Sequence, residues 1–440
     1  MVSINSKTDQ AQVDSLVERL NSDESFDIHV DKFILKHPGH LPALINLLSL
    51  WALKCGKNKV VLPYRSEAEI EALYAYPLIL AAIVFAESSC YLNDKKTKVK
   101  KISKIIATSY LEIESIFSYR IKAVLEQERF IKLKSSFEDD TTDKLKWLNN
   151  EIKRLEASKK KVSKSLFSNS ENRLFIGCFD DFPRLDYPKF FYNTSTLDVS
   201  NEKKFSGIIQ DAFTNVFLKK TSEVITSGVV NELSSIAFEL FHNTDSWAKT
   251  DFETGQKYKF NCRGAEISIL EDITNQEIQN EDVFASFCKS LTIEKLDRIE
   301  YKQQALIPNL SAKKIGLFEI SIFDNGPGLS VQWLKKDLDK VASNDEYDAI
   351  LKCFKKHMTS DPSVKAPFRG NGLSRVIDII KNRGFIRVRS GRMDLSRNFF
   401  QFELNKNQEK ESLNFDGKET TKSPVRGTII TVLYPFIYTN

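Results

Sequence analysis

Segments with helical periodicity and segments with strand periodicity alternate along the chain from about residue 201 onwards. Helices are expected at 205–217, 229–248 and 372–382, where apolar residues recur every three or four positions. Strands are expected at 265–270, 317–323, 385–390, 399–404 and 428–434. Helices interleaved with a sheet of at least five strands predict a C-terminal α/β sandwich.

Residues 1–140 are expected to form a mainly helical domain with short strands at 27–30 and 60–63, so the chain as a whole is of the α+β class. The longest apolar stretches, 41–53 and 76–86, are shorter than the ~20 residues that a membrane-spanning helix needs. Both are therefore predicted to be buried helices. His37 and His40 flank a Pro-Gly pair, which predicts a turn with solvent-facing imidazoles, the alternative being a metal pair.

Residues 141–168 are expected to form a short helix of coiled-coil type. Positions 145, 148, 152, 155, 159, 162 and 166 follow alternating spacings of three and four, and six of these seven residues are apolar. The pattern fits a homodimer through residues 145–166 and equally fits packing onto the N-terminal domain. A connector at 169–204 is then expected to lead into the last domain, 205–440.

Charge and cysteine content exclude several classes of function. The net charge of +5 arises from 64 basic and 59 acidic side chains, which does not indicate a nucleic-acid-binding surface. None of the six cysteines has C-x-x-C spacing, so neither a zinc site nor a redox motif is indicated. The first residues lack the apolar core of a signal peptide, and we expect a cytoplasmic protein that does not enter a membrane.

The chain has 16 glycines and two G-x-G units, and each unit stands at the border of a predicted element. Gly326 and Gly328 follow a strand that ends at Asp324, whose carboxylate can accept a hydrogen bond from an exocyclic amine such as that of adenine. Gly370 and Gly372 precede a helix, where free amides bind phosphate. The alternative is that the glycines only shape a turn and a helix entry.

Two further motifs bear groups suited to nucleotide chemistry. Glu239 and Asn243 are four residues apart on a predicted helix and share one face, so the amide oxygen can ligate Mg²⁺ while the carboxylate polarises a water. Thr428 follows Gly427 at the start of the last strand, where its hydroxyl can reach a base through water. The alternatives are an exposed helical pair and ordinary turn chemistry.

Taken in order, these four motifs resemble those of the GHKL superfamily, which includes gyrase, heat-shock chaperones, histidine kinases, mismatch-repair ATPases and microrchidia ATPases. The motifs are E-x-x-x-N, D-x-G-x-G, G-x-G-L, and G-T before a final strand, and they extend over residues 205–436. The resemblance implies a Bergerat-type ATP-binding fold with ATP and Mg²⁺ as its ligands.

The resemblance also implies a role for each matching residue. Glu239 would be the general base and Asn243 the Mg²⁺ ligand. The adenine would be bound by Asp324, Gly326, Gly328 and Thr428, and the phosphates would lie at Gly370, Gly372 and Leu373. Residues 330–369 would form the ATP lid, with His357, Lys365 and Arg369 as candidate phosphate contacts.

The sequence departs from the gyrase-like branch at the position seven residues after Glu239. That branch has an aspartate there, whereas this chain has Ser246, with Asp245 one residue earlier. A histidine kinase is not expected, because that group usually has Asn in place of the glutamate and needs a phosphoacceptor histidine. None of the five histidines follows a Ser-x-x-His-Glu type of sequence.

Three functions are compatible with these motifs. The first is an ATPase in a bacterial regulatory or defence system, whose lid closure drives a change in conformation or assembly with a protein partner or a second copy of the chain. The second is a protein serine kinase of the anti-sigma-factor type, which also keeps a glutamate and an asparagine on this helix. The third is an ATP-gated binding module that does not hydrolyse its ligand.

Overall fold

The computed structural model describes residues 1–5, 7–31, 38–55, 58–63, 77–86, 90–92, 95–96, 173–180, 191–193, 196–207, 227–251, 253–270, 273, 283–301, 313–358, 372–400, 415 and 422–439. Within these ranges the chain is a mixed α+β structure, as expected, built around a six-stranded antiparallel sheet. The coiled-coil pattern expected at 145–166 lies outside the described residues.

The large sheet is formed by strands that are far apart in the sequence. Their spatial order is β10 (Met393–Asn398), β9 (Phe385–Gly391), β11 (Val425–Thr439), β8 (Lys313–Asp324), β7 (Cys262–Leu270) and β6 (Arg173–Phe179), and every neighbouring pair is antiparallel. The two central strands β8 and β11 are buried on both faces, which explains their nearly continuous apolar sequences.

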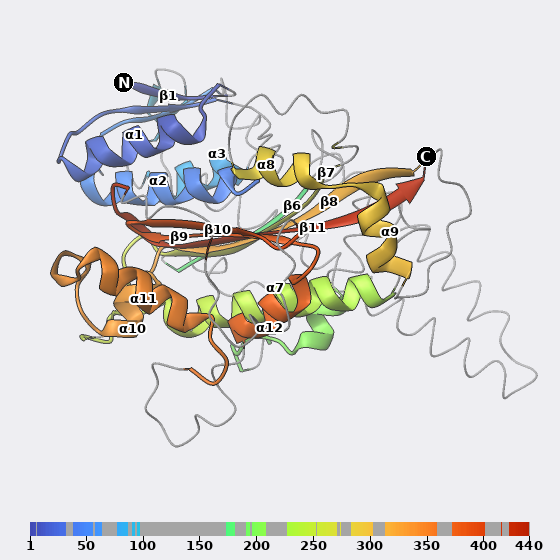
Figure 1. Cartoon of the computed structure of the whole chain (residues 1–440). Helices are drawn as coiled ribbons and strands as arrows, with labels where there is room; N and C mark the ends of the chain where they lie inside the picture. The colour runs from blue at the N-terminus through green and yellow to red at the C-terminus, as the bar shows by residue number, and fades with distance from the viewer. Residues whose placement is uncertain are drawn as a thin grey trace, which may run out of the picture.

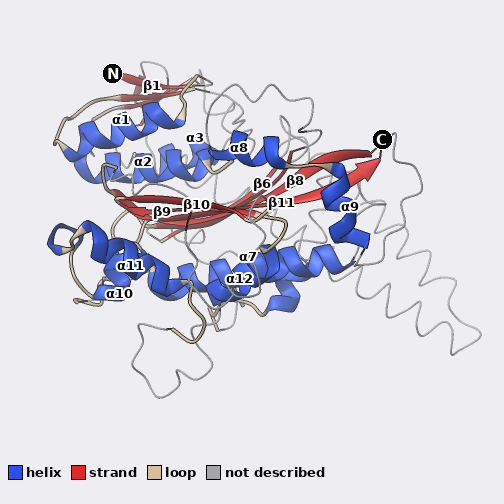
Figure 2. Ribbon diagram, in the orientation of Figure 1, coloured by secondary structure: helices blue, strands red, loops and turns tan. Residues whose placement is uncertain are grey.

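Helices cover both faces of the large sheet (Figures 1 and 2). One face carries α7 (Ser227–Trp247), α10 (Leu329–Leu334), α11 (Ser343–Cys353) and α12 (Gly372–Ile380). The other carries α1 (Gln10–Asn21), α2 (His40–Cys55) and α3 (Pro77–Phe85), and α8 (Val283–Ser290) and α9 (Ile293–Tyr301) follow towards the C-terminal end of β11. The arrangement is a layered sandwich in which helices from the first part of the chain pack on a sheet formed by its later part.

The N-terminal unit, the described part of residues 1–96, has a small sheet of its own. Strands β1 (Val2–Ile4), β2 (Ile28–Val30), β3 (Val60–Leu62) and β4 (Cys90–Leu92) are parallel neighbours, and β5 (Lys95–Lys96) is antiparallel to β4. The helix α2 contacts α1, α3 and strands β7, β8 and β11 of the large sheet. Because it is covered on all sides, its apolar residues show little amphipathic pattern.

The strands at 27–30 and 60–63 and the two buried helices are confirmed, whereas three expectations were wrong. The strand expected at 399–404 does not begin at Phe399, because Phe399 and Phe400 form a turn after β10 (Met393–Asn398), and residues 401–404 lie outside the described residues. The connector contains the edge strand β6. The imidazole of His40 is buried, because α2 begins at that residue and packs into the core.

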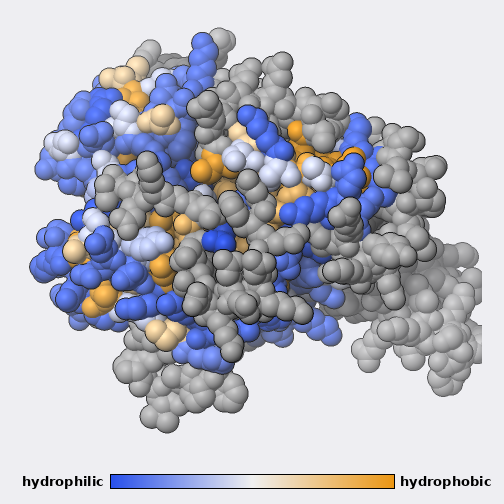
Figure 3. Space-filling model, in the orientation of Figure 1, coloured by the Kyte–Doolittle hydropathy of each residue, from blue (hydrophilic) through white to orange (hydrophobic). Residues whose placement is uncertain are grey.

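On the face in Figure 3, hydrophilic residues predominate over the described surface, and apolar residues appear in small areas between them. Within the ranges that the structure describes, no helix has both the length and the apolar character required to cross a membrane. The apolar residues are instead gathered into a continuous core that joins α1, α2 and α3 to the large sheet and to α7 and α12.

Candidate functional site

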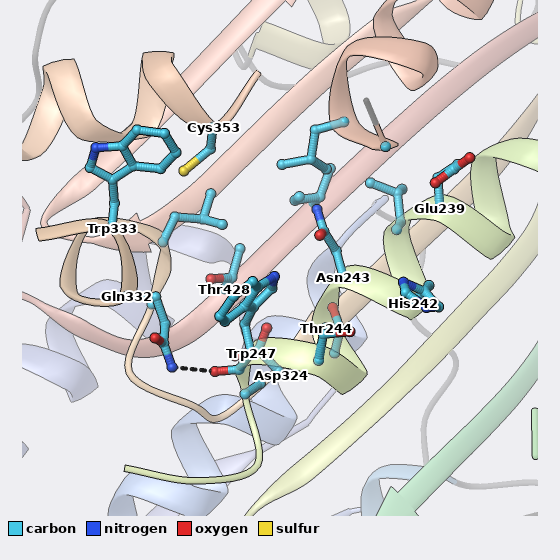
Figure 4. A pocket seen from close by; sticks show the side chains of 18 of the residues that line it. Glu239, His242, Asn243, Thr244, Trp247, Asp324, Gln332, Trp333, Cys353 and Thr428 are labelled. Carbon is cyan, nitrogen blue, oxygen red and sulfur yellow. Dashed lines mark hydrogen bonds between the residues drawn. The ribbon is translucent and has the colours of Figure 1, made fainter. Parts of the chain in front are cut away.

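A cavity of about 270 Å³ lies on the α7 side of the large sheet, where β8 ends and β11 begins (Figure 4). Seven of the residues predicted from the sequence line it: Glu239, Asn243, Asp324, Gly328, Gly372, Leu373 and Thr428. They come from α7, the end of β8, the turn before α10, the start of α12 and β11. The fold therefore brings all four sequence motifs to a single pocket.

The helix α7 supplies one wall of this pocket. Leu233, Ile236 and Leu240 are buried and belong to the common core, so the orientation of the helix is fixed by packing. Glu239 and Asn243 then fall on the neighbouring face, four residues apart, and both line the cavity. In Figure 4, Glu239 stands at one end of the pocket, Asp324 stands near the other, and Asn243 lies between them.

The Glu239 carboxylate meets the first turn of α12. Its Oε1 atom accepts a hydrogen bond of 2.9 Å from Nη1 of Arg375, whose other amino group donates to Glu202 at 2.9 Å. The second oxygen, Oε2, points at Gly372, where a Cβ atom would lie only 2.9 Å from it. The helix start that was predicted to bind phosphate is thus adjacent to the predicted general base.

With Glu239 as the general base that the resemblance implies, we expect the substitution Gly372→Ala to raise stability and to lower ATP turnover. Alanine favours a helix over glycine by at most about 1 kcal/mol, but its methyl group would push Glu239 away from its position. A displaced catalytic group costs about 10- to 100-fold in kcat. Thermal unfolding and steady-state phosphate release measure the two effects, and Gly207→Ala, a helical position with nothing within 4 Å, is the matched control.

The Asp324 carboxylate is buried at the end of β8, with 5% of the residue exposed. Burial raises the pKa of this carboxyl to about 7, although the backbone N–H groups of Gly326 and Thr428 act in the opposite direction. The Gly326 N–H donates to Oδ1 at 2.9 Å. Because Asp324 also lines the cavity, a bound amine would meet a carboxylate that is already fixed in position.

The two glycines that follow Asp324 have different functions. Gly326 does not line the cavity, and a Cβ there would lie 2.7 Å from the Cα of Ala248, so this glycine allows the turn to pack against the end of α7. Gly328 does line the cavity and has a φ of 90°, which side-chain-bearing residues rarely adopt. It is also the N-cap residue of α10.

Buried ionic groups lie next to the adenine end of the predicted site. Arg263 is opposite Asp324 in the β7–β8 ladder and is paired with Asp180 at 2.5 Å. Asp245, the residue adjacent to the position where the gyrase-like branch has its aspartate, lies 3.7 Å from Arg263 and accepts a hydrogen bond from Tyr192. Asp245 therefore does not line the pocket, and its contacts stabilise the strands behind it.

Several lining residues were not predicted from the sequence. Trp247 lies on the same face of α7 as Glu239 and Asn243, and this spacing was the one signal that could have indicated it. Five others come from the segment after Gly328 and carry no motif: Leu329, Gln332, Trp333, Cys353 and Met358. The remaining unpredicted lining residues lie on or directly after α7, in the turn after β8 and on β11: Phe238, Leu240, His242, Thr244, Ser246, Ala248, Pro327 and Ile430. Gln332 donates to the carbonyl oxygen of Trp247 at 2.6 Å, which connects α10 to the end of α7.

The first part of the predicted lid is a packed helical segment. Residues 330–358 contain α10, a 3-10 turn at Leu338–Lys340, and α11, and the buried Glu346 is paired with Arg392 at 2.7 Å. The exposed His357 lies close to the end of this segment. Lys365, Arg369 and Gly370 lie outside the described residues, but Met358 and Gly372 on either side of that gap both line the pocket.

Comparison with protein-family models, with curated protein sequences and with solved structures finds no match to this chain. Among the residues that the structure describes, there is also no group of three or more His, Cys, Asp or Glu side chains that could hold a metal ion. The geometry of the pocket and the sequence motifs that form it are therefore the basis for any functional assignment.

Proposed function

We propose that this protein binds ATP in the pocket between α7, α12 and the ends of β8 and β11, and hydrolyses it by a GHKL-type mechanism within a Bergerat-type fold. The observation that carries this proposal is the convergence of four motifs, separated by up to 189 positions between Glu239 and Thr428, on one cavity. Four independent motifs would rarely share a cavity if each served only local turn or helix chemistry.

The two ends of the cavity suit the two ends of a nucleotide. At one end, the buried carboxylate of Asp324 can accept a hydrogen bond from the adenine amine, and the Thr428 hydroxyl lies beside it in the paired strand. At the other end, the first residues of α12 line the cavity, and the N-terminus of a helix favours phosphate. The adenine would therefore lie near Asp324 and the terminal phosphate near Gly372 and Glu239.

Asn243 fits the role of a magnesium ligand in this arrangement. Its side chain lies in the cavity between the two ends, and Mg²⁺ bound with nucleotides takes few protein ligands, because phosphate oxygens and waters complete its shell. The ion would neutralise phosphate charge during the reaction. A single amide ligand is consistent with the described residues, which contain no preformed acidic cluster.

Glu239 is the residue best placed to accept a proton from the attacking water. It lies at the phosphate end of the pocket on a packed helix, and its Oε2 atom faces the start of α12. Arg375 fixes the other oxygen, which limits the rotation of the carboxylate. We infer an ATPase whose cycle changes contacts to a protein partner or a second copy of the chain, in a bacterial regulatory or defence role.

Titration with Mg-ATP tests the proposal directly. A ligand present at one hundred times its dissociation constant raises the free energy of unfolding by about 2.7 kcal/mol, so we expect a clear rise in melting temperature with Mg-ATP and a smaller one with Mg-GTP. Release of free phosphate from γ-labelled ATP would support hydrolysis. Label on a protein would instead indicate a kinase, and binding without turnover would indicate an ATP-gated module.

A further inference from the structure

The N-terminal unit packs on the face of the large sheet opposite the pocket. Asn46 on α2 is 5% exposed, and its Nδ2 atom donates to the backbone carbonyl oxygens of Asp324 and Arg426, each at 3.2 Å. Asp324 lines the cavity through its side chain. Arg426 lies two positions before Thr428, which also lines the cavity. One amide thus joins the two strand ends that form the adenine end.

The Asp324 carbonyl belongs to the last residue of β8, and the Arg426 carbonyl belongs to irregular backbone at the start of β11. The pairing of β11 with β9 shifts between Val425 and Thr428, so Arg426 and Gly427 lie in a bulge. Gly427 has a φ of 82°, and a Cβ there would lie 1.9 Å from the carbonyl oxygen of Asp324. Strand pairing alone does not determine the spacing of such a bulge, and the Asn46 hydrogen bonds supply the missing restraint.

The chemistry of the contact requires an amide donor at this position. The two N–H bonds of a carboxamide can serve two acceptors at once, whereas a carboxylate would place a negative oxygen against two carbonyls. The Oδ1 atom of Asn46 has no hydrogen-bond partner among the described residues, so the donor function is the one that this contact uses. The donor function explains why a buried amide stands on this mainly apolar helix.

We propose that Asn46 is a positioning residue for the adenine-binding end of the pocket, through which the N-terminal unit and nucleotide occupancy are energetically coupled. This inference rests on the proposed function, because it assumes that the Asp324 and Thr428 side chains contact a nucleotide. Binding requires both strand ends to keep their spacing, and α2 is the element that maintains it from the other face of the sheet. Coupling of this kind is reciprocal, so nucleotide would in turn stabilise α2.

The substitution Asn46→Ala tests the proposal. It removes two restraints at the adenine end, and Glu239 lies at the far end of the cavity, so we expect KM for ATP to rise about 5- to 10-fold while kcat stays within about twofold. The substitution Asn46→Asp should raise KM further. Equilibrium titration with Mg-ADP measures the same loss without turnover.

The matched control is Ser49→Ala on the same helix. Ser49 is fully buried, faces the same interface and donates from Oγ to the carbonyl oxygen of Phe260 at 2.9 Å, but that residue does not line the cavity. Both alanine variants lose buried hydrogen bonds to the backbone, so both should lower the melting temperature. We expect only Asn46→Ala to change nucleotide affinity by more than about twofold.

The inference can also be tested on the unmodified protein, so that the result does not depend on whether a variant folds. Saturation with Mg-ADP should slow amide hydrogen exchange in α2 around Asn46, because the two strand ends on which it packs become more rigid. If Mg-ADP binds but the exchange rates in α2 stay the same, the inference is wrong. It is also wrong if the Asn46→Ala and Ser49→Ala variants bind nucleotide with equal affinity. Either result would leave the proposed function intact, whereas absence of binding to the unmodified protein would overturn both.

Discussion

Replacing Glu239 by Gln is expected to abolish nearly all ATP turnover while leaving Mg-ATP binding close to that of the unmodified protein. The loss follows from the position of its carboxylate at the phosphate end of the pocket, where it can accept a proton from water and an amide cannot. A general base contributes about 100- to 10,000-fold to a rate. Phosphate release and calorimetric titration with Mg-ATP give kcat and affinity separately.

The ion pair with Arg375 provides a control for this experiment. Arg375 binds Glu202 as well as Glu239, and its side chain is 44% exposed, so loss of either partner should cost no more than about 1 kcal/mol of stability. Glu202→Gln removes a carboxylate from the same arginine, but Glu202 does not line the cavity. Full activity in that variant together with undiminished turnover in Glu239→Gln would remove Glu239 from the catalytic role.

Replacing Asp324 by Asn is expected to weaken Mg-ATP binding by about 10- to 100-fold, the effect of leaving one buried polar contact mismatched. The new amide can still accept from the Gly326 N–H through its oxygen. Its NH₂ group, however, would face either the Thr428 N–H or the adenine amine, and both are donors. Titration with Mg-ATP at pH 8 measures the change in affinity with the carboxyl of the unmodified protein mostly ionised.

The same substitution should change the dependence of stability on pH. Burial raises the pKa of Asp324 from 3.8 to about 7, so the folded protein retains a proton that the unfolded chain has lost between these values. The unmodified protein therefore loses stability as the pH rises through this interval. At about 1.4 kcal/mol per pKa unit, the loss amounts to at most about 4 kcal/mol. The Asp324→Asn variant should not show this loss of stability. Its free energy of unfolding, relative to that of the unmodified protein, should therefore increase as the pH rises from 4 to 8.

The substitution Asp394→Asn gives the opposite sign and so controls for general effects of pH. Asp394 on β10 is paired with Arg387 at 2.7 Å and with Lys422 at 2.8 Å. Although burial alone would raise it, these partners hold the pKa of Asp394 well below its usual range. Its contribution to stability is present at neutral pH and disappears as the pH falls. Urea unfolding should show Asp324→Asn gaining stability relative to the unmodified protein as the pH rises from 3.8 to about 7. Asp394→Asn should differ in its pH dependence only below the unfolded pKa of 3.8, where the unmodified protein loses the contribution that this variant lacks.

The elements that carry the predicted pocket residues could be predicted because they depend on local sequence patterns. The helix expected at 229–248 is found at Ser227–Trp247, and a fixed spacing of four residues places Glu239 and Asn243 on one face of it. Likewise, an alternating apolar pattern predicts the strand that ends at Asp324, and a helical pattern predicts the helix that begins at Gly372. The glycines at the borders of these elements indicate where each one ends or begins. Each of these features is determined within about a dozen residues.

The environment of the pocket could not be predicted, because it depends on contacts between distant parts of the chain. Asn46 and Asp324 are 278 positions apart, and no periodicity indicates that α2 packs behind β8. The edge strand β6 was missed because it pairs on one side only and lies in a segment read as a connector. The pocket wall formed by Gln332 and Trp333 carries no motif, so only the folded arrangement of α10 identifies it.

The continuous core that joins the N-terminal unit to the large sheet has a consequence for how such a protein can change during evolution. The two halves share buried side chains instead of meeting across a polar boundary, so the proposed nucleotide site cannot be transferred to another protein as an independent module. Any descendant that replaced the first hundred residues would have to supply a new apolar cover for one entire side of the sheet. We therefore expect inheritance of both halves together, with sequence variation concentrated in the segments between them.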